Sequence, residues 1–312
     1  MIENTLWFEK YRPKKIEDCV LSDKMAKTFK GFLKTKNVPN LMLTGIQGTG
    51  KTTLGKVIAK ELGAELLYID CSTDSGKSMI QEMIVPYAST ISIENPDVPK
   101  FILCDEADYL TATAQASLRP IIERYSLTTR FIFTGNFSER IIQALKSRCA
   151  CFDFSITKED KPQLMTNFFK RCEYILQDNG VQYDKKVLMT FISKAFPDFR
   201  RIINELQSYS IGRGVIDEGI LTIGLANTIA DEVYPLLKEH KFDMARKWVA
   251  ESVHSPEDVF ASLYNRMNDY VTQKEKQPEL ILIIAQYQDY ATRVANQNIN
   301  LMACFTEMMN VL

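Results

Sequence analysis

The fold of this chain is decided by the stretch Leu41-Met-Leu-Thr44-Gly45-Ile-Gln-Gly48-Thr-Gly50-Lys51-Thr52. Its first four residues form a short apolar run, the next eight fit the pattern GxxxxGK[ST], and a helical pattern follows over Thr53–Leu62. A strand, a glycine-rich turn and a helix in this order are the setting in which the pattern marks a phosphate-binding P-loop. The sequence therefore predicts a nucleotide-binding α/β core around these residues.

Each residue of the predicted P-loop has an expected task toward ATP. Glycines let backbone N–H groups approach the phosphates, and the helix N-terminus adds partial positive charge. Lys51 is expected to reach the β- and γ-phosphates, and the Thr52 hydroxyl is expected to ligate Mg²⁺. The residues that we expect to wrap the phosphates are Gly48, Thr49, Gly50, Lys51, Thr52 and Thr53.

An apolar run that ends in acids, Phe101-Ile-Leu-Cys-Asp105-Glu106, follows the P-loop after about fifty residues. This is the form of a Walker B strand. Asp105 is expected to hold Mg²⁺, directly or through water, and Glu106 to orient and polarise the water that attacks the γ-phosphorus. Asn136 ends the next apolar run, where its amide would bind both that water and the γ-phosphate, although asparagine is also a common turn residue.

Short apolar runs alternate with helical patterns in the first half of the chain, which is typical of a parallel α/β sheet. After Phe154 only helical patterns follow, and the glycines of Ile211–Val215 interrupt them once. We predict an α/β core with a five-stranded parallel sheet over residues 1–155, a helical domain over 156–222 and a second helical block over 223–312. The predicted strands are Leu41–Thr44, Leu66–Ile69, Phe101–Cys104, Phe131–Thr134 and Cys151–Phe154.

The helical half carries two further signals. Asp184 and Asp198 are predicted to be the N-caps of two helices, because an aspartate side chain accepts from the free N–H groups of the first turn. Leu280–Ala285 is apolar on every side, which a surface helix does not tolerate. That helix is either an interface between copies of the chain or part of the core of a self-contained bundle.

The composition excludes several classes of protein. The chain has 312 residues, 46% hydrophobic and 25% charged, with a net charge of −1, so neither disorder nor coating of nucleic acid by bulk charge is expected. The seven cysteines are odd in number and form no paired CxxC motifs, which favours reduced thiols. With no signal-peptide pattern and no long apolar stretch, we expect a cytoplasmic protein.

Five motifs together resemble the small subunits of sliding-clamp loaders from archaea, eukaryotes and T4-type phages, which are AAA+ ATPases. They span about two-thirds of the chain, and the segment Phe196–Leu221 looks most like the ATPase subunit of the T4-type phage loader. The resemblance implies an AAA+ core, a helical lid and a helical collar. The motifs are Trp7–Pro13 (WFEKYRP), the P-loop, Asp105–Asp108 (DEAD), Ser147–Cys149 (SRC) and Phe196–Arg200 (FPDFR).

The same resemblance implies roles that the residues alone do not. Arg200 would be the sensor-2 arginine, which touches phosphate and couples the lid angle to the nucleotide. Arg148, in the SRC motif, would enter the ATP site of the neighbouring subunit as an arginine finger, so that hydrolysis needs an assembled ring. The adenine and ribose pocket would be lined by Glu9, Lys10, Tyr11 and Val20.

Two positions depart from the family pattern. Ile46-Gln47 stand where prolines are usual in the P-loop, which leaves the phosphate cradle intact because those positions act through their backbone. Pro120 stands where the family usually keeps a second basic residue in a continuous helix, and a proline there is expected to kink that helix or mark its start.

Two segments are candidates for contacts with other macromolecules. A small-residue turn at the start of a helix suits DNA phosphates, although an ordinary capped helix start has the same letters. The predicted DNA contacts are Ser75, Gly76, Lys77 and Ser78. The next residues have the spacing of peptides that bind sliding clamps, although a buried amphipathic face would also have it. The predicted clamp contacts are Gln81, Ile84 and Tyr87.

The sequence thus predicts the ATPase subunit of a DNA sliding-clamp loader, which uses ATP and Mg²⁺ to load a clamp on primer–template DNA. Its expected partners are the clamp, DNA, copies of itself and a divergent loader subunit in a pentameric spiral. One alternative is another AAA+ machine, such as a helicase loader or a branch-migration motor, although no pore loop or added duplex-binding domain is present. A non-hydrolysing scaffold is disfavoured because Lys51, Thr52, Asp105 and Glu106 are retained.

Overall fold

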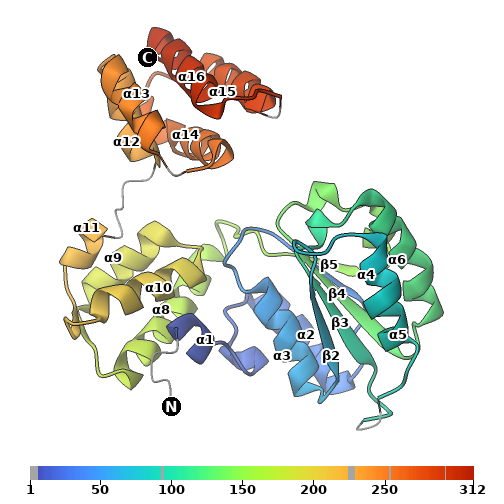
Figure 1. Cartoon of the computed structure of the whole chain (residues 1–312). Coiled ribbons are helices and arrows are strands. Elements are labelled where there is room, and N and C mark those ends of the chain that lie inside the picture. Colours follow the sequence, from blue (N-terminus) through green and yellow to red (C-terminus); the bar gives the residue numbers. More distant parts are fainter. Residues whose placement is uncertain (1–5, 93–94, 224–228, 253, 292) are drawn as a thin grey trace. The chain divides into compact units, whose positions relative to one another are not determined.

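A five-stranded parallel sheet lies at the centre of the first part of the chain in the computed structural model (Figure 1). Its strand order, β2-β3-β4-β1-β5, confirms the predicted sheet. Along β1, Leu41 and Leu43 pack in one hydrophobic cluster and Met42 in another, so both faces of the sheet are buried and the strand is apolar throughout. The strands are β1 (Leu41–Thr44), β2 (Leu66–Asp70), β3 (Lys100–Asp105), β4 (Thr129–Gly135) and β5 (Ala150–Asp153).

The structure describes residues 6–92, 95–223, 229–252, 254–291 and 293–312. The chain divides into two units, 1–224 and 225–312. The predicted boundary between residues 222 and 223 lies beside residues 224–228, which are outside the described residues. The finer division of the first unit at residue 155 remains a prediction.

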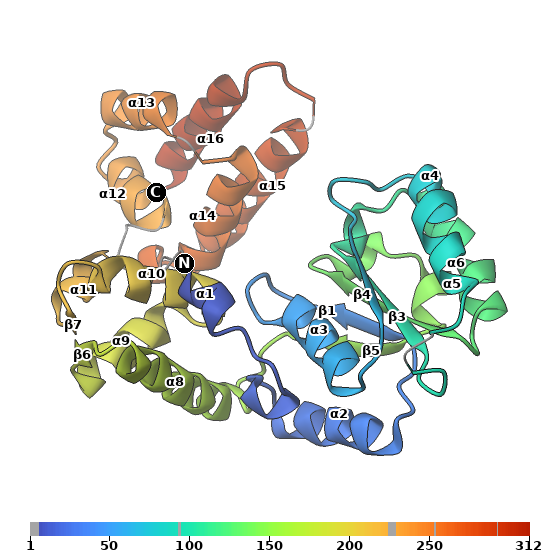
Figure 2. The same cartoon turned by 60° about the horizontal axis from the view of Figure 1, so that its bottom comes forward.

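Helices cover both faces of the sheet (Figure 2). One face carries α2 (Asp23–Thr35) and α3 (Lys51–Glu61), which share a hydrophobic cluster with β1. The other face carries α6 (Ala112–Arg124), the short α7 (Gln143–Lys146) and a continuous helical segment. That segment consists of α4 (Lys77–Met79), a π-helical stretch (Ile80–Ile84) and α5 (Val85–Ala88).

Helix α6 continues through Pro120, so this proline does not mark the start of a helix. Proline has no N–H group, so the carbonyl of Ala116, one turn earlier, has no helical donor. Because Ala116 and Pro120 are exposed, water can bind that carbonyl. The helix therefore tolerates the proline on its outer face.

The rest of the first unit is helical, with one exception. Asp184 and Asp198 cap α9 and α10, as predicted, because each carboxylate accepts from N–H groups of the first turn. Two short strands that the sequence did not predict, β6 (Gln182–Tyr183) and β7 (Val215–Ile216), pair in parallel. The helices here are α8 (Lys161–Asp178), α9 (Lys185–Ala195), α10 (Phe199–Ser210) and α11 (Gly219–Ile223).

The N-terminal segment joins the two parts of the first unit. Trp7 and Tyr11, on α1 (Trp7–Lys10) and just after it, pack in the cluster formed by α8, α9 and α10. Ile16 and Leu21 pack in the cluster beside the sheet. The chain between Tyr11 and Ile16 therefore passes from the helices α8–α10, the lid, to the core around the sheet.

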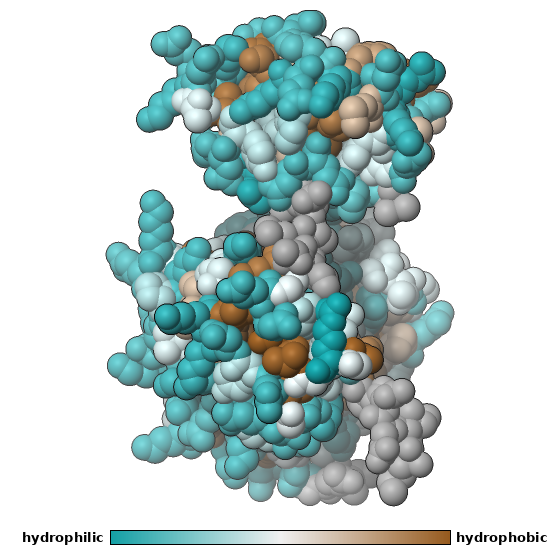
Figure 3. Space-filling model, turned by 90° about the vertical axis from the view of Figure 1, so that its left-hand side faces the viewer, coloured by the Kyte–Doolittle hydropathy of each residue, from teal (hydrophilic) through white to brown (hydrophobic). Residues whose placement is uncertain are grey.

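The second unit is a helical bundle with its own hydrophobic cluster. On α15, Leu280, Ile283 and Ile284 are buried in this cluster, while Ile281 and Leu282 are 39% and 70% exposed. On the face of the molecule that Figure 3 shows, apolar side chains lie scattered among polar ones. The described residues include no helix long and apolar enough to cross a membrane. The helices are α12 (Ile229–Lys238), α13 (Phe242–Glu251), α14 (Pro256–Tyr270), α15 (Gln277–Ala291) and α16 (Gln297–Val311).

Candidate functional site: a nucleotide pocket

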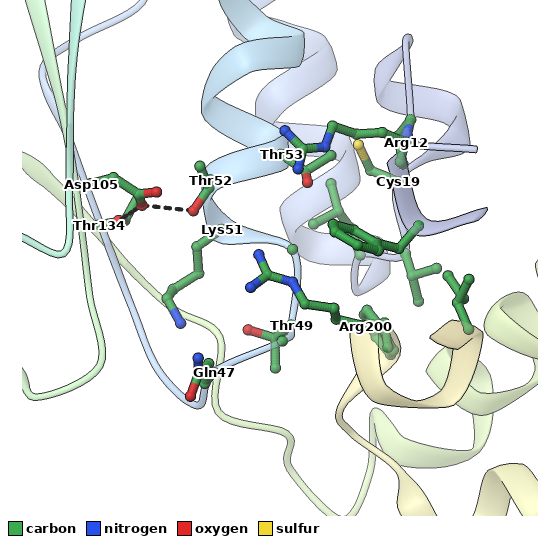
Figure 4. Close-up of a pocket in the computed structure, with 18 of the residues that line it drawn as sticks. Arg12, Cys19, Gln47, Thr49, Lys51, Thr52, Thr53, Asp105, Thr134 and Arg200 are labelled. Carbon is green, nitrogen blue, oxygen red and sulfur yellow. Dashed lines mark hydrogen bonds between the residues drawn. The ribbon is translucent and has the colours of Figure 1, made fainter. Parts of the chain in front are cut away.

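A pocket of about 290 Å³ lies where the P-loop, the carboxyl ends of β2, β3 and β4, the N-terminal segment and the lid helices α8 and α10 meet (Figure 4). Twelve predicted residues line it: Tyr11, Val20, Gly48, Thr49, Gly50, Lys51, Thr52, Thr53, Asp105, Glu106, Asn136 and Arg200. The predicted residues Glu9 and Lys10 do not line it. Lining residues that sequence reasoning missed include Phe8, Arg12, Cys19, Tyr68, Thr134 and Arg171.

Lys51 is buried at the start of α3 and donates three hydrogen bonds. Its Nζ lies 2.7 Å from the Gly45 carbonyl oxygen, 2.8 Å from that of Ile46 and 3.0 Å from Asn136 Oδ1. Burial lowers the pKa of Lys51 to about 8, against the opposing effect of the nearby carboxylates. The amine is therefore fixed in the P-loop beside the end of β4.

Three hydroxyl groups hold the Asp105 carboxylate at the end of β3. Thr52 Oγ1 donates to Asp105 Oδ1 at 2.7 Å, Thr134 Oγ1 donates to the same oxygen, and Tyr68 Oη donates to Oδ2 at 3.0 Å. The Tyr68 pKa is raised by burial and by Asp105, so its hydroxyl remains a donor. These contacts fix the carboxylate beside the Thr52 hydroxyl.

Hard oxygen ligands suit Mg²⁺, which binds through one or two protein groups and takes its other ligands from water and phosphates. The Thr52 hydroxyl and the Asp105 carboxylate, 2.7 Å apart, form such a pair. Among the described residues no cluster of three or more His, Cys, Asp or Glu side chains could hold a metal alone. The donor set thus fits Mg²⁺ bound together with a nucleotide.

Glu106 stands at a backbone position that is unfavourable for most residues. Its φ of 54° lies in the left-handed region, and its N–H donates to Thr134 Oγ1 at 3.1 Å. Burial, and then the charge of Asp105, raise the pKa of its carboxyl group. Such a strained residue beside a phosphate-binding loop points to a functional role for this carboxylate.

Asp108 positions the end of β4. Its Oδ2 accepts from the backbone N–H groups of Asn136 at 3.2 Å and Phe137 at 3.1 Å. The neighbouring Gly135 permits this approach, because a Cβ there would lie 3.0 Å from Asp108 Oδ1. In the sequence Asp108 is only the last residue of the DEAD motif, and the structure shows that it orients the backbone of Asn136.

The lid reaches the P-loop through the start of α10. Phe199 N–H donates to the Gly48 carbonyl oxygen at 3.2 Å, and Asp198 lies against the Cα of Gly48. Arg200, in the first turn of α10, points into the pocket toward the P-loop (Figure 4). Its guanidinium carbon lies 5.5 Å from the centroid of the Phe8 ring.

The N-terminal segment differs from expectation. Glu9 and Lys10 lie outside the pocket because α1 turns Trp7 and Tyr11 inward, which leaves these two side chains exposed, whereas Phe8 lines the pocket. Glu9 forms an ion pair with Arg12 at 2.5 Å, and Arg12 lines the pocket and reaches over Thr53 (Figure 4). Lys10 pairs with Asp178 at 3.4 Å, on the lid.

The remaining predicted residues lie away from the pocket. Arg148 follows α7 and pairs with Glu123 on α6. Of the predicted DNA contacts, Lys77 and Ser78 are exposed, while Ser75 and Gly76 are half-buried. Ile84 is fully buried in the cluster beneath α6, so it cannot contact a clamp from this position and that prediction is corrected. In the π-helical stretch the exposed side chains are Gln81, Glu82 and Met83.

A P-loop, a Walker B strand and a lid arginine around one pocket define a AAA+ ATPase. Family models match three regions: residues 41–159 the ATPase family associated with various cellular activities, 160–222 the AAA+ ATPase lid domain of the sliding-clamp-loader large subunit, and 2–75 the Rad17 P-loop domain. A solved structure of a Thermotoga maritima RuvB variant superposes with a TM-score of 0.57 at 16% identity, covering 82% of this chain and 91% of its own. That likeness shows the fold alone.

Relatives of known name narrow the class. The replication factor C small subunit of Aeropyrum pernix is 32% identical over 90% of this chain and 87% of its own length, and that of Archaeoglobus fulgidus is 31% identical over 95% and 94%. The probable replication factor C subunit 5 of Dictyostelium discoideum is 29% identical over 99% and 85%. The chain belongs to the replication factor C small-subunit family of AAA+ clamp-loader ATPases.

Proposed function

We propose that this chain uses ATP binding and hydrolysis to load a sliding clamp on primer–template DNA. The observation that carries the proposal is that one pocket joins Lys51, Asp105, Glu106 and Asn136 of the core to Arg200 of the lid. A nucleotide bound there would touch both parts of the first unit. Its presence or loss would therefore change how the lid meets the core, which is the motion that a loader needs.

Within the pocket, the P-loop N–H groups and Lys51 bind the phosphates, and Glu106 orients and polarises the attacking water. The side chain of Asn136 holds that water and the γ-phosphate, with its backbone fixed by Asp108. Thr52 and Asp105 would hold Mg²⁺, which supplies positive charge to the phosphate oxygens. Arg200 acts from the lid as the sensor of the γ-phosphate.

Surfaces for DNA and the clamp are proposed on the helical segment α4–α5, on the face of the sheet that also carries α6. DNA phosphates would meet the start of α4, where Lys77 and Ser78 are exposed. The clamp would meet the next residues through Gln81 and Met83, with Tyr87 at the border. Tyr87 is half-buried, and the Lys100 ammonium lies 4.2 Å from its ring centroid, so it contributes at most an edge.

Assembly is proposed through the second unit, where Ile281 and Leu282 expose apolar surface on α15. Copies of the chain and a divergent subunit would form a pentameric spiral, in which Arg148 enters the neighbouring site. We also propose that the loader is of T4-type phage origin, on the strength of the segment Phe196–Leu221. Assembly with a phage-type rather than an archaeal-type partner subunit would test this origin.

A mixing experiment tests the shared ATP site. Arg148→Ala keeps an intact phosphate cradle and Lys51→Ala keeps an intact finger, so each variant alone should lack DNA-stimulated ATPase activity. A finger arginine supplied by a partner contributes on the order of 10³-fold or more to turnover in P-loop enzymes. Mixed assemblies should therefore recover part of the activity. No recovery in assemblies verified to contain both variants would contradict the proposal, as would full activity of a dilute monomer.

A further inference from the structure

Arg148 is held by three hydrogen bonds outside its own nucleotide pocket. Its Nε and Nη2 donate to Glu123 Oε1 at 2.8 and 2.5 Å, and its Nη1 donates to the Ala144 carbonyl oxygen at 2.7 Å. Glu123 lies on α6 and Ala144 on α7. Contacts with α6 and with α7 therefore fix the guanidinium group.

Two donors remain on the Arg148 guanidinium. A guanidinium has five N–H groups in a rigid plane, and the three contacts use one N–H on each of its three nitrogens. One N–H on Nη1 and one on Nη2 are left, and we call these two groups the free edge. No acceptor among the described residues contacts them, and the side chain stays 26% exposed. Two N–H groups on neighbouring nitrogens can donate to two oxygens of one phosphate group.

The position of Glu123 is unusual for a helix. It lies in the last turn of α6, where the partial negative charge of the helix end disfavours an acidic side chain. Its placement against α7 is set by the core, because Leu118 and Ile122 of α6 share a hydrophobic cluster with Leu145 of α7. The ion pair with Arg148 offsets the unfavourable charge at the helix end.

We propose that Glu123 is a positioning residue for Arg148, which holds the guanidinium with its free edge outward toward the phosphates of a neighbouring subunit. This inference rests on the proposed role of Arg148 in trans. An arginine that is already fixed loses less rotamer freedom when it meets the phosphate. More of the free energy of that contact therefore stabilises the transition state, which raises turnover.

The test measures kcat and KM for ATP in the assembled loader with primer–template DNA. Glu123→Ala should lower kcat about tenfold with little change in KM, because the phosphate cradle of each subunit is intact. Glu123→Gln should retain most of the activity, since the amide oxygen can accept the same two hydrogen bonds. Glu159→Ala, which removes an exposed glutamate elsewhere, is the matched control and should behave as wild type.

A double-mutant cycle separates the possible results. In an Arg148→Ala background, Glu123→Ala should have no further effect, because nothing remains to position. A rise in turnover for Glu123→Ala would show that the glutamate withholds the arginine and would overturn the inference. Wild-type turnover of Glu123→Ala beside an inactive Arg148→Ala would overturn it as well, while leaving the trans role intact. Wild-type turnover of Arg148→Ala would remove the trans role itself.

Discussion

Asp105 shows what a single residue gains from the fold around it. Thr52 is in the P-loop motif, but Tyr68 and Thr134 belong to the neighbouring strands β2 and β4. Asp70 pairs with Asp105 in the sheet, so Tyr68, two residues earlier, faces the same side. The Walker B and P-loop motifs predict the Asp105 carboxylate and its partner Thr52. The contacts from Tyr68 and Thr134 depend on which strands are neighbours and in what register they pair, and no local sequence pattern specifies either.

The pKa of Lys51 makes ATP affinity depend on pH. Burial lowers this pKa to about 8, and phosphates bind only the ammonium form. Binding therefore keeps the proton on, so affinity is constant below this pKa and falls as the pH rises through it. We expect the Kd for ATP to increase by up to about tenfold per pH unit above pH 8. Equilibrium titrations with a fluorescent ATP analogue between pH 7 and 10 would measure it.

Lys51→Arg is the control for this prediction, because a guanidinium stays charged over the whole range. The variant should bind ATP less tightly, since the shape of its donor group differs, but its Kd should be independent of pH. An unchanged pH dependence in Lys51→Arg would assign the titration to another group.

At the scale of helices and strands, local patterns predicted what local forces determine. Asp184 and Asp198 cap their helices as expected, since capping involves only neighbouring residues. The spacing around Ile84 fits either a clamp contact or a buried helix face, and the packing against α6 decides for burial. The strands β6 and β7, of two residues each, are too short for any alternating pattern. The resemblance predicts Glu9 and Lys10 in the nucleotide pocket, but the turn of α1 places both outside it.

The contact between the P-loop and α10 depends on one glycine. A Cβ on Gly48 would lie 2.2 Å from Asp198 Oδ1, and the φ of this residue is +80°. Gly48→Ala should therefore displace Asp198, whose Oδ1 accepts from Arg201 N–H at 3.0 Å and caps α10. Loss of such a cap costs about 1 kcal/mol, in addition to the cost of alanine in the left-handed region. Thermal unfolding without nucleotide would measure the sum.

Gly50→Ala provides a matched comparison, because Gly50 has a φ of +92° and a methyl group added there would meet nothing within 4 Å. It should show the backbone cost alone and a smaller drop in unfolding temperature. Adding Asp198→Ala to Gly48→Ala should remove the steric part of the penalty, so that the two substitutions are less than additive. Equal effects of Gly48→Ala and Gly50→Ala would show that the lid does not press on the P-loop.

At the scale of the whole molecule, the two units differ in what each contains and what each leaves exposed. The first unit contains the residues of a phosphate cradle, but its Arg148 lies outside that pocket. The second unit buries Leu280, Ile283 and Ile284 in its own core and still leaves apolar side chains exposed on the same helix. The sequence offered two explanations for the apolar run Leu280–Ala285, a bundle core or an interface. The folded unit buries three of its six residues and leaves Ile281, Leu282 and Ala285 exposed.

Leu282→Lys tests whether that exposed surface holds the assembly together. Leu282 is already 70% exposed, so lysine there should leave the fold and the unfolding temperature of the isolated chain nearly unchanged. In an interface the ammonium would lose its water without a partner, which costs several kcal/mol per site and should shift the chain toward monomers. Leu127→Lys, at a leucine that is 92% exposed in the first unit, introduces the same charge and should not change assembly. Sedimentation velocity over a range of concentrations, together with DNA-stimulated ATPase activity, would follow both variants. If Leu282→Lys folded and assembled like the wild-type chain, copies of the chain would have to meet through another surface. Helix α15 would then be only a part of the bundle.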